Sequence, residues 1–292
     1  MFRKLLIVAL FLMLAGSLNS SFAFQSEKET SDFIAKNIQV KTDFSKTAIK
    51  ISAIPKKVVV GGFNIRYLLY APKVTFGGAL SGANMVAAVA KAELFDKMKA
   101  QVLKFTPLIV ASYQNHFKSS KIEIMPIGTA STSKSYQESQ YKSEIVSRDM
   151  FDIEWEYSSF DTYWKMPAAG LKFIYGGDVP KKLFPALRKE AGADGVAWVN
   201  IALFRTGDDT LKLGDCIVEI YAPAKSDRDP DFLAFSVNLK TTNIYSKIDI
   251  KKDQWKDKDN KEKAVEEYWL IFGKWFDDLF TSYSYIADQS IK

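Results

Sequence analysis

The sequence predicts an α/β fold in which a mixed sheet of about five strands has helices packed on it. Runs of β-branched, aromatic and alternating apolar residues predict the strands. Apolar residues spaced three and four apart predict helices between them, including a long aromatic helix over about 261–286. This interleaving is typical of a sheet covered by helices. The five strand runs are 57–72, 121–128, 196–204, 211–222 and 232–241.

The first strand run, KVVVGGFNIRYLLYAP, is interrupted by Gly61 and Gly62, where we expect a bulge or a close approach of another backbone. An alanine-rich helical run follows, and Pro107 is expected to kink that helix or to begin a second one. The next strand run begins at Lys121. The predicted order in this half is therefore strand, long helix, strand.

The run from Ala186 to Phe204, ALRKEAGADGVAWVNIALF, changes from a helical to a strand pattern at GADG. Its spacing predicts a helix over 176–192 that ends with Gly192 in the C′ position. Both alternating sets of the following strand are largely apolar, which predicts a central strand covered on both faces. Phosphate-binding loops lead from a strand into a helix. GADG has the reverse order, and we expect it to mark the fold and not a ligand site.

The last two strand runs each have one strongly apolar alternating set, which predicts half-buried strands joined as antiparallel hairpins. The C-terminal helix has a wide aromatic stripe that we expect to pack on the sheet. The alternative is that this helix contacts envelope proteins or a second copy of the chain. The residues of that alternative surface are Tyr268, Phe272, Trp275 and Leu279.

The first 23 residues have the order of a secretory signal peptide, with Arg3 and Lys4, a short apolar run, and small residues before a cut after Ala23. Residues 24–57 are polar and are assigned to a leader. Residues 58–292 are assigned to a single α/β domain with an irregular insertion at about 129–167. We therefore expect a periplasmic or secreted protein. After signal removal we expect no transmembrane segment, because no later apolar run is long enough to cross a bilayer.

The charge pattern argues against a nucleic-acid partner. The chain has a net charge of +6, but its densest charged run, 247–263, interleaves lysines with acidic residues. A nucleic-acid surface needs one sign of charge on one face. The single cysteine, Cys216, cannot form an internal disulfide, and its apolar strand neighbours predict a buried, inert thiol.

Residues for metal or cofactor chemistry are sparse. A single histidine, His116, excludes His-rich metal sites, and its position near a helix C-terminus favours a structural role. The loop GGALSGAN lies between a strand and a helix, but Ala83 and Asn84 stand where a phosphate-binding loop has Lys and Ser or Thr. We therefore expect no cofactor and no metal.

The best candidate site is the acidic and aromatic segment RDMFDIEWEYSSFDTYW at 148–164. Paired carboxylates can act in glycoside hydrolysis, and aromatic rings can stack on sugars. The same pattern also describes an ordinary amphipathic strand or lid. The catalytic candidates are Asp152, Glu154, Glu156 and Asp161, and the ligand-binding candidates are Trp155, Tyr163 and Trp164.

The motif GADGV, from Gly192 to Val196, follows a helix and precedes a predicted central strand, and VVVGGF gives a weaker second match. In this order of elements the chain resembles the periplasmic domain of the curli-secretion lipoprotein (CsgG-like) superfamily and the N-terminal domain of the TolB translocation proteins. The resemblance implies an α/β domain at the cell envelope.

Together these patterns predict an exported, non-enzymatic envelope protein that acts through protein contacts or within an outer-membrane-associated assembly. Two alternatives use the segment 149–164. One is a secreted, carboxylate-dependent hydrolase, and the other is a carbohydrate-binding module.

Overall fold

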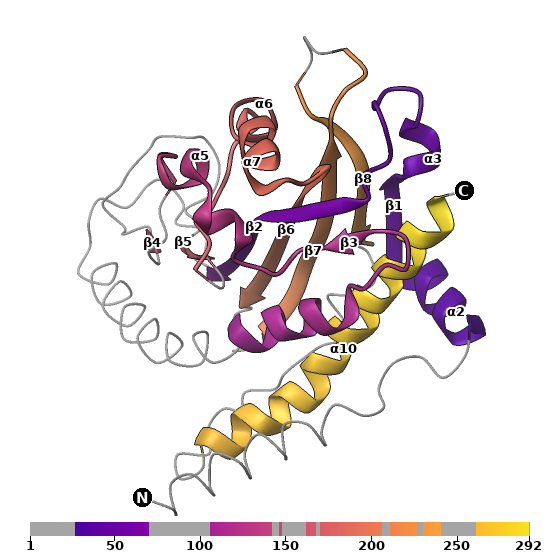
Figure 1. The fold of residues 1–292 in the computed structure, drawn as a ribbon. Helices are drawn as coiled ribbons and strands as arrows, with labels where there is room; N and C mark the ends of the chain where they lie inside the picture. The colour runs from indigo at the N-terminus through magenta and orange to yellow at the C-terminus, as the bar shows by residue number, and fades with distance from the viewer. Residues whose placement is uncertain are drawn as a thin grey trace, which may run out of the picture.

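The computed structural model shows one curved, mixed sheet with helices on both faces (Figure 1). The strand order is β1-β8-β7-β6-β2-β5-β4, and β3 pairs with β2 beside this path. The predicted α/β class is therefore confirmed. The described residues are 27–69, 106–141, 146–147, 162–167, 170–205, 211–226, 230–240 and 261–291.

Within the described residues the sheet has six strands of five or more residues, one more than the five predicted. They are β1 (Ile38–Thr42), β2 (Lys57–Leu69), β5 (Thr162–Pro167), β6 (Gly195–Arg205), β7 (Leu211–Ala222) and β8 (Phe232–Leu239). The predicted strand 121–128 shrinks to the two residues of β3 (Glu123–Ile124), and β4 (Val146–Ser147) is equally short.

The sequence did not reveal β1 or β5. β1 has the sequence IQVKT and alternates buried Ile38 with exposed polar residues, inside the segment assigned to a leader. A short strand of this composition has a weak local pattern, and pairing with β8 supplies its hydrogen bonds. β5 comes from the end of the predicted insertion and pairs with β2.

β6 is the central strand. It runs parallel to β2 and antiparallel to β7, and β7 in turn is antiparallel to β8. The predicted hairpins are therefore confirmed. Both alternating sets of β6 are buried or half-buried from Gly195 to Leu203, as expected for a strand covered on both faces.

The described helices are α2 (Glu27–Asn37), α3 (Phe44–Thr47), a helix through 106–116, the 3-10 helix η1 (Thr129–Thr132), α5 (Lys134–Gln137), α6 (Val179–Lys182), α7 (Phe184–Ala191) and α10 (Lys261–Ser290). The single helix predicted over 176–192 is in fact two, α6 and α7, divided at Leu183. Pro185 lies in the first turn of α7. It has no N–H to donate to the carbonyl of Lys181, so the first helix stops.

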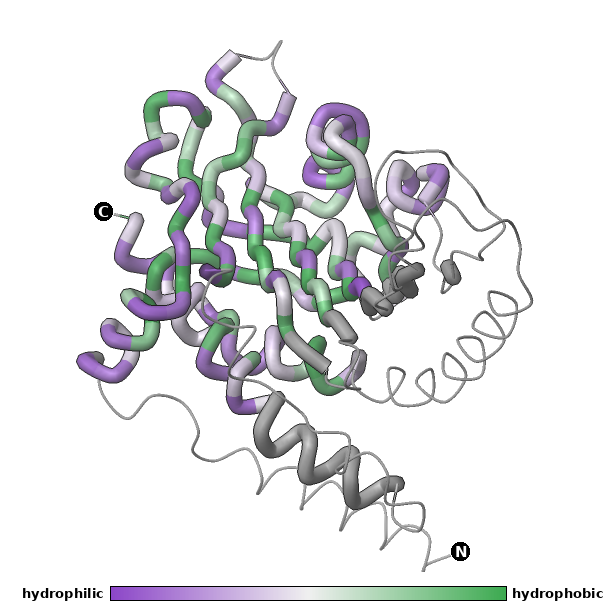
Figure 2. Tube along the Cα trace, turned by 180° about the vertical axis from the view of Figure 1, so that it is seen from behind, coloured by the Kyte–Doolittle hydropathy of each residue, from purple (hydrophilic) through white to green (hydrophobic). Residues whose placement is uncertain are grey.

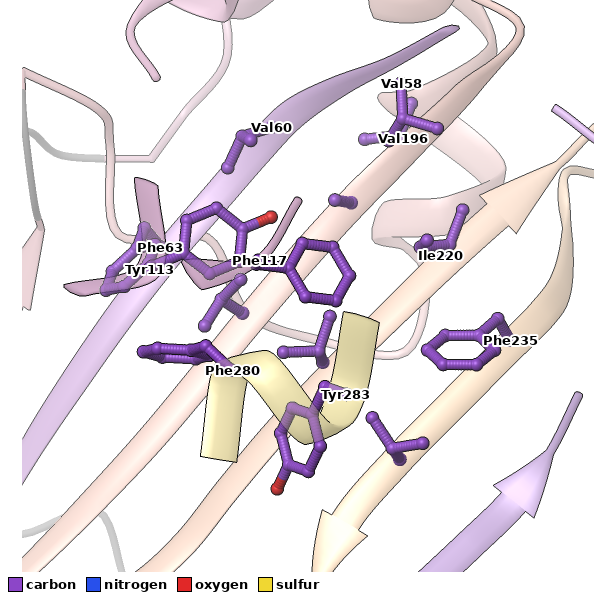
Figure 3. Close-up of a cluster of buried hydrophobic side chains, with 14 of the residues drawn as sticks. Val58, Val60, Phe63, Tyr113, Phe117, Val196, Ile220, Phe235, Phe280 and Tyr283 are labelled. Atoms are coloured by element: carbon purple, nitrogen blue, oxygen red, sulfur yellow. The ribbon is translucent and has the colours of Figure 1, made fainter. Parts of the chain in front are cut away.

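Helical layers cover opposite faces of the sheet. On one face, α10 and the helix through 106–116 meet Phe63 of β2, whose ring centroid lies 5.3 Å from that of Tyr113 (Figure 3). Phe63 pairs with Val199. Trp198 precedes Val199 in β6 and therefore lies on the other face, where Phe184 of α7 contacts it at 5.9 Å.

The glycine pair of β2 allows this second layer to approach closely. The register with β6 shifts between Val60 and Gly62, which is the predicted bulge. A Cβ at Gly61 would lie 2.6 Å from Val196, and a Cβ at Gly62 would lie 2.5 Å from the side chain of Ile174. The predicted bulge is confirmed, while the groups that come close to the two glycines are side chains and not another backbone.

Candidate functional site

Most of the sequence-predicted site lies outside the described residues. This applies to Asp152, Glu154, Trp155, Glu156 and Asp161. The structure places Tyr163 and Trp164 in β5, where they pair with Leu68 and Tyr67 of β2, and it describes their backbone only. These two candidates therefore belong to a regular strand of the sheet.

The C-terminal helix has a buried half that matches the main prediction. Phe276, Leu279, Phe280 and Tyr283 are fully buried against the sheet (Figure 3), and the Tyr283 hydroxyl donates a 2.5 Å hydrogen bond to the carbonyl oxygen of Cys216. Leu279 was placed in the alternative partner surface, and this assignment is wrong because its side chain is fully buried in the hydrophobic core.

Trp275 lies at the border of that buried half. It is half-buried, and its ring centroid is 5.5 Å from that of Phe33 in α2. The two rings line a shallow surface groove of about 290 Å³ together with Asp32, Lys36 and Asn37. For Tyr268 and Phe272, the structure describes the helical backbone and not the side chains.

The first half of α10 extends away from the sheet. Figure 1 shows the yellow helix running past the helix through 106–116, and Figure 2 shows the sheet and the later turns of the helix from behind. The two halves of one continuous helix thus have different surroundings. The first turns, from Lys261, form an arm, and the later turns form part of the core.

A polar network connects α10 to the helix through 106–116. The Ser112 hydroxyl donates to Oδ1 of Asp277 at 2.5 Å, and His116 Nε2 lies 3.3 Å from the same oxygen. His116 Nδ1 lies 3.3 Å from the hydroxyl of Thr281. Hydroxyl, imidazole and carboxylate follow the order of a catalytic triad, but these contacts join two packed helices. They support the structural role predicted for His116.

Asp278 is an ionisable residue that the sequence did not single out. Burial raises its pKa to about 6, and the nearby Lys274 opposes that rise. Lys274 Nζ lies 3.4 Å from Oδ2, while Oδ1 is buried without a hydrogen-bond partner in the described part of the chain. The sequence does not predict the burial and raised pKa of Asp278, because Asp277 and Asp278 are adjacent and differ only in what packs against them.

Cys216 is buried on β7, and burial raises the pKa of its thiol well above the ordinary range. The predicted inert thiol is therefore supported, because the reactive species is the thiolate. The described residues contain no group of three or more His, Cys, Asp or Glu side chains arranged to hold a metal ion.

The GADG turn is held by hydrogen bonds to α7 and to the start of β2. Gly192 adopts φ 63° and closes α7 through bonds to the carbonyls of Arg188 and Lys189. Oδ2 of Asp194 accepts from the backbone N–H groups of Lys56 and Lys57, at 3.2 and 3.1 Å. These contacts join the start of β6 to the start of β2, and the prediction that GADG ends a helix and leads into the central strand is confirmed.

Comparison of the chain with protein-family models, curated proteins and solved structures finds no match. The resemblance to the CsgG-like and TolB domains therefore stays a prediction. Within the described part of the chain, none of the helices combines the length and the hydropathy that a bilayer crossing requires.

Proposed function

We propose that the protein is an exported, non-enzymatic component of the cell envelope, periplasmic or secreted, that acts through protein contacts. The projecting half of α10 is the contact element. The signal-like first 23 residues support export. The contact role is supported by the length of the projecting half of α10 and by the apolar run in its sequence.

α10 is longer than the section that packs in the core of the described residues. Its 30 residues span about 45 Å at 1.5 Å per residue. The described buried positions run from Gly273 to Ala287 and account for about 22 Å of that length. The remaining turns are long enough to be engaged by another protein.

The sequence of the arm is apolar where the helix leaves the sheet. Residues 268–272 read YWLIF, and five consecutive helical positions, 100° apart, cover more than a full circle. The sequence of this stretch therefore has no polar stripe at helical spacing. An apolar surface of this kind is typical of a protein interaction site.

Site-specific photo-crosslinking in the source cells tests this function. A photoreactive amino acid at Leu270, in full-length protein, is expected to give discrete adducts in the envelope fraction. The same amino acid at Ile49, which is 74% exposed in a turn outside α10, is the matched control. Export is checked separately by the mass of the mature chain, which is expected to begin at Phe24.

Adducts that form at Leu270, and not at Ile49, and that disappear in a Trp269→Glu background would support the contact role. Identical adduct patterns at the two positions would overturn it. Recovery of unprocessed protein from the cytosol would contradict the proposed location.

A further inference from the structure

Among the described residues, two large apolar side chains are mostly exposed, Ile49 and Tyr175. Tyr175 is 55% exposed and follows the segment that packs on the glycine pair of β2. An aromatic ring on the surface carries a large apolar area and a polar hydroxyl, and such rings are common in binding sites.

The Tyr175 ring is held in place by two other rings. Its centroid lies 5.6 Å from that of Tyr141 in an edge-to-face arrangement, and 6.2 Å from that of the buried Phe173. The chain then turns at Gly176, which has φ 106°, and enters α6. A ring fixed in this way loses little conformational freedom when a ligand binds to it.

An ion pair lies near Tyr141. Lys182 Nζ is 2.7 Å from Oδ2 of Asp178, and their side chains are 77% and 44% exposed. Burial raises the pKa of Tyr141; the charge of Asp178 raises it further, and that of Lys182 lowers it. Both charged groups therefore lie near Tyr141, whose ring contacts that of Tyr175. Each has hydrogen-bonding capacity beyond their mutual bond.

We infer that Tyr175, Tyr141, Asp178 and Lys182 form a carbohydrate-binding site in which a sugar ring stacks on Tyr175. The face of an aromatic ring carries partial negative charge and attracts the weakly positive C–H groups of a sugar. Hydroxyl groups at the rim of the sugar can donate to Asp178 and accept from Lys182. This site is independent of the α10 arm.

Titration of the isotope-labelled mature protein with cellotriose and with maltotriose, followed by NMR, tests the site. Both probes are neutral, so the positive charge of the chain cannot attract them. At least one is expected to give saturable shifts at Tyr141 and residues 173–178, with a Kd of about 1 mM, the range for a small exposed site. Tyr175→Ala is expected to weaken binding by about tenfold or more.

Two variants distinguish stacking from other effects. Tyr175→Phe keeps the ring and is expected to retain binding within about threefold. Ile49→Ala removes the other exposed apolar side chain and is expected to leave the titration unchanged. Absence of saturable shifts with both sugars would overturn the site, and so would shifts that persist in Tyr175→Ala. Saturation by an apolar peptide in place of either sugar would show that this surface binds protein.

Discussion

The two faces of the sheet combine apolar and polar contacts in different ways. On the face of α10, several aromatic rings pack on one another, and Phe280 contacts Tyr113 at 5.2 Å and Tyr283 at 6.3 Å. On the opposite face, Phe184 packs on Trp198, glycines leave room for neighbouring side chains, and directed polar contacts link the chain to the sheet. The side-chain amide of Asn64, for example, donates to the carbonyl of Ile174 at 2.5 Å and accepts from its N–H at 3.2 Å.

This difference shows where each face is sensitive to substitution. Apolar packing is non-directional, so its loss scales with the volume removed. A polar contact in a buried place contributes little net stability while it is intact, but removal of one partner leaves the other unpaired. The α10 face should respond to truncation, and the opposite face to loss of one member of a pair.

The largest effect is expected from Phe280→Ala on the α10 face. The ring is fully buried among three other aromatic rings, and its loss should lower the free energy of unfolding by about 3–5 kcal/mol. Urea unfolding followed by circular dichroism measures it. Phe280→Leu keeps most of the volume and should cost less than about 1.5 kcal/mol. If the two variants cost the same, the packing on this face is not the source of its stability.

A smaller loss is expected from Arg188→Met on the opposite face. Arg188 donates two bonds to Asp231, at 3.2 and 3.1 Å, and the Asp231 side chain is 3% exposed. An unpaired carboxylate at this position should lower the free energy of unfolding by about 2–4 kcal/mol. The double variant Arg188→Met, Asp231→Leu should recover most of that loss in the same urea assay. No recovery would mean that Arg188 acts through its apolar stem.

The sequence predicted the elements whose evidence is local. β2, β6, β7 and β8 have period-two patterns, the stripe of α10 has helical spacing, and Gly192 ends a helix, so neighbouring residues were sufficient. β1 and β5 depend on pairing with β8 and β2, which lie far away in the sequence. The hydrogen bonds between Asn64 and Ile174 are a further example of a distant contact. They join residues 110 apart, and no local sequence pattern predicts them.

The candidate sites also differ in whether local sequence is enough to predict them. The arm of α10 could be found, because YWLIF is a continuous run within a helical pattern. The surface around Tyr175 could not, since the fold alone brings Tyr141 to it. A weak signal was present in the sequence: Tyr175 precedes Gly176 and Gly177, a pair typical of turns, and connecting segments run over the protein surface.

An intermediate and pH-dependent effect is expected from Asp278→Asn. The folded-state pKa of Asp278 is raised to about 6 by burial, against an ordinary value of 3.8. Between these values the folded protein keeps a proton that the unfolded chain releases, so this group lowers stability as pH rises through the window. Asp278→Asn should therefore raise the free energy of unfolding by about 1–2 kcal/mol at pH 8 and leave it unchanged at pH 3.5.

The adjacent carboxylate is the matched control for that measurement. Asp277 accepts from Ser112 and contacts His116, so Asp277→Asn should not stabilise the protein at pH 8. Urea unfolding at the two pH values compares the variants. A gain for Asp278→Asn that is equal at both pH values would contradict burial of the charge as its cause.

The smallest effect on stability is expected from Gly192→Ala, at the C-terminal end of α7 on the face opposite α10. Gly192 has φ 63° and nothing within 4 Å of the position that a Cβ would take, so Gly192→Ala should meet backbone strain and no steric clash. That strain should lower the free energy of unfolding by about 1 kcal/mol. Gly192→Asn should cost less, because asparagine tolerates the left-handed region. A loss of several kcal/mol for Gly192→Ala would instead show that the position of Asp194, and with it the connection of β6 to β2, depends on this residue.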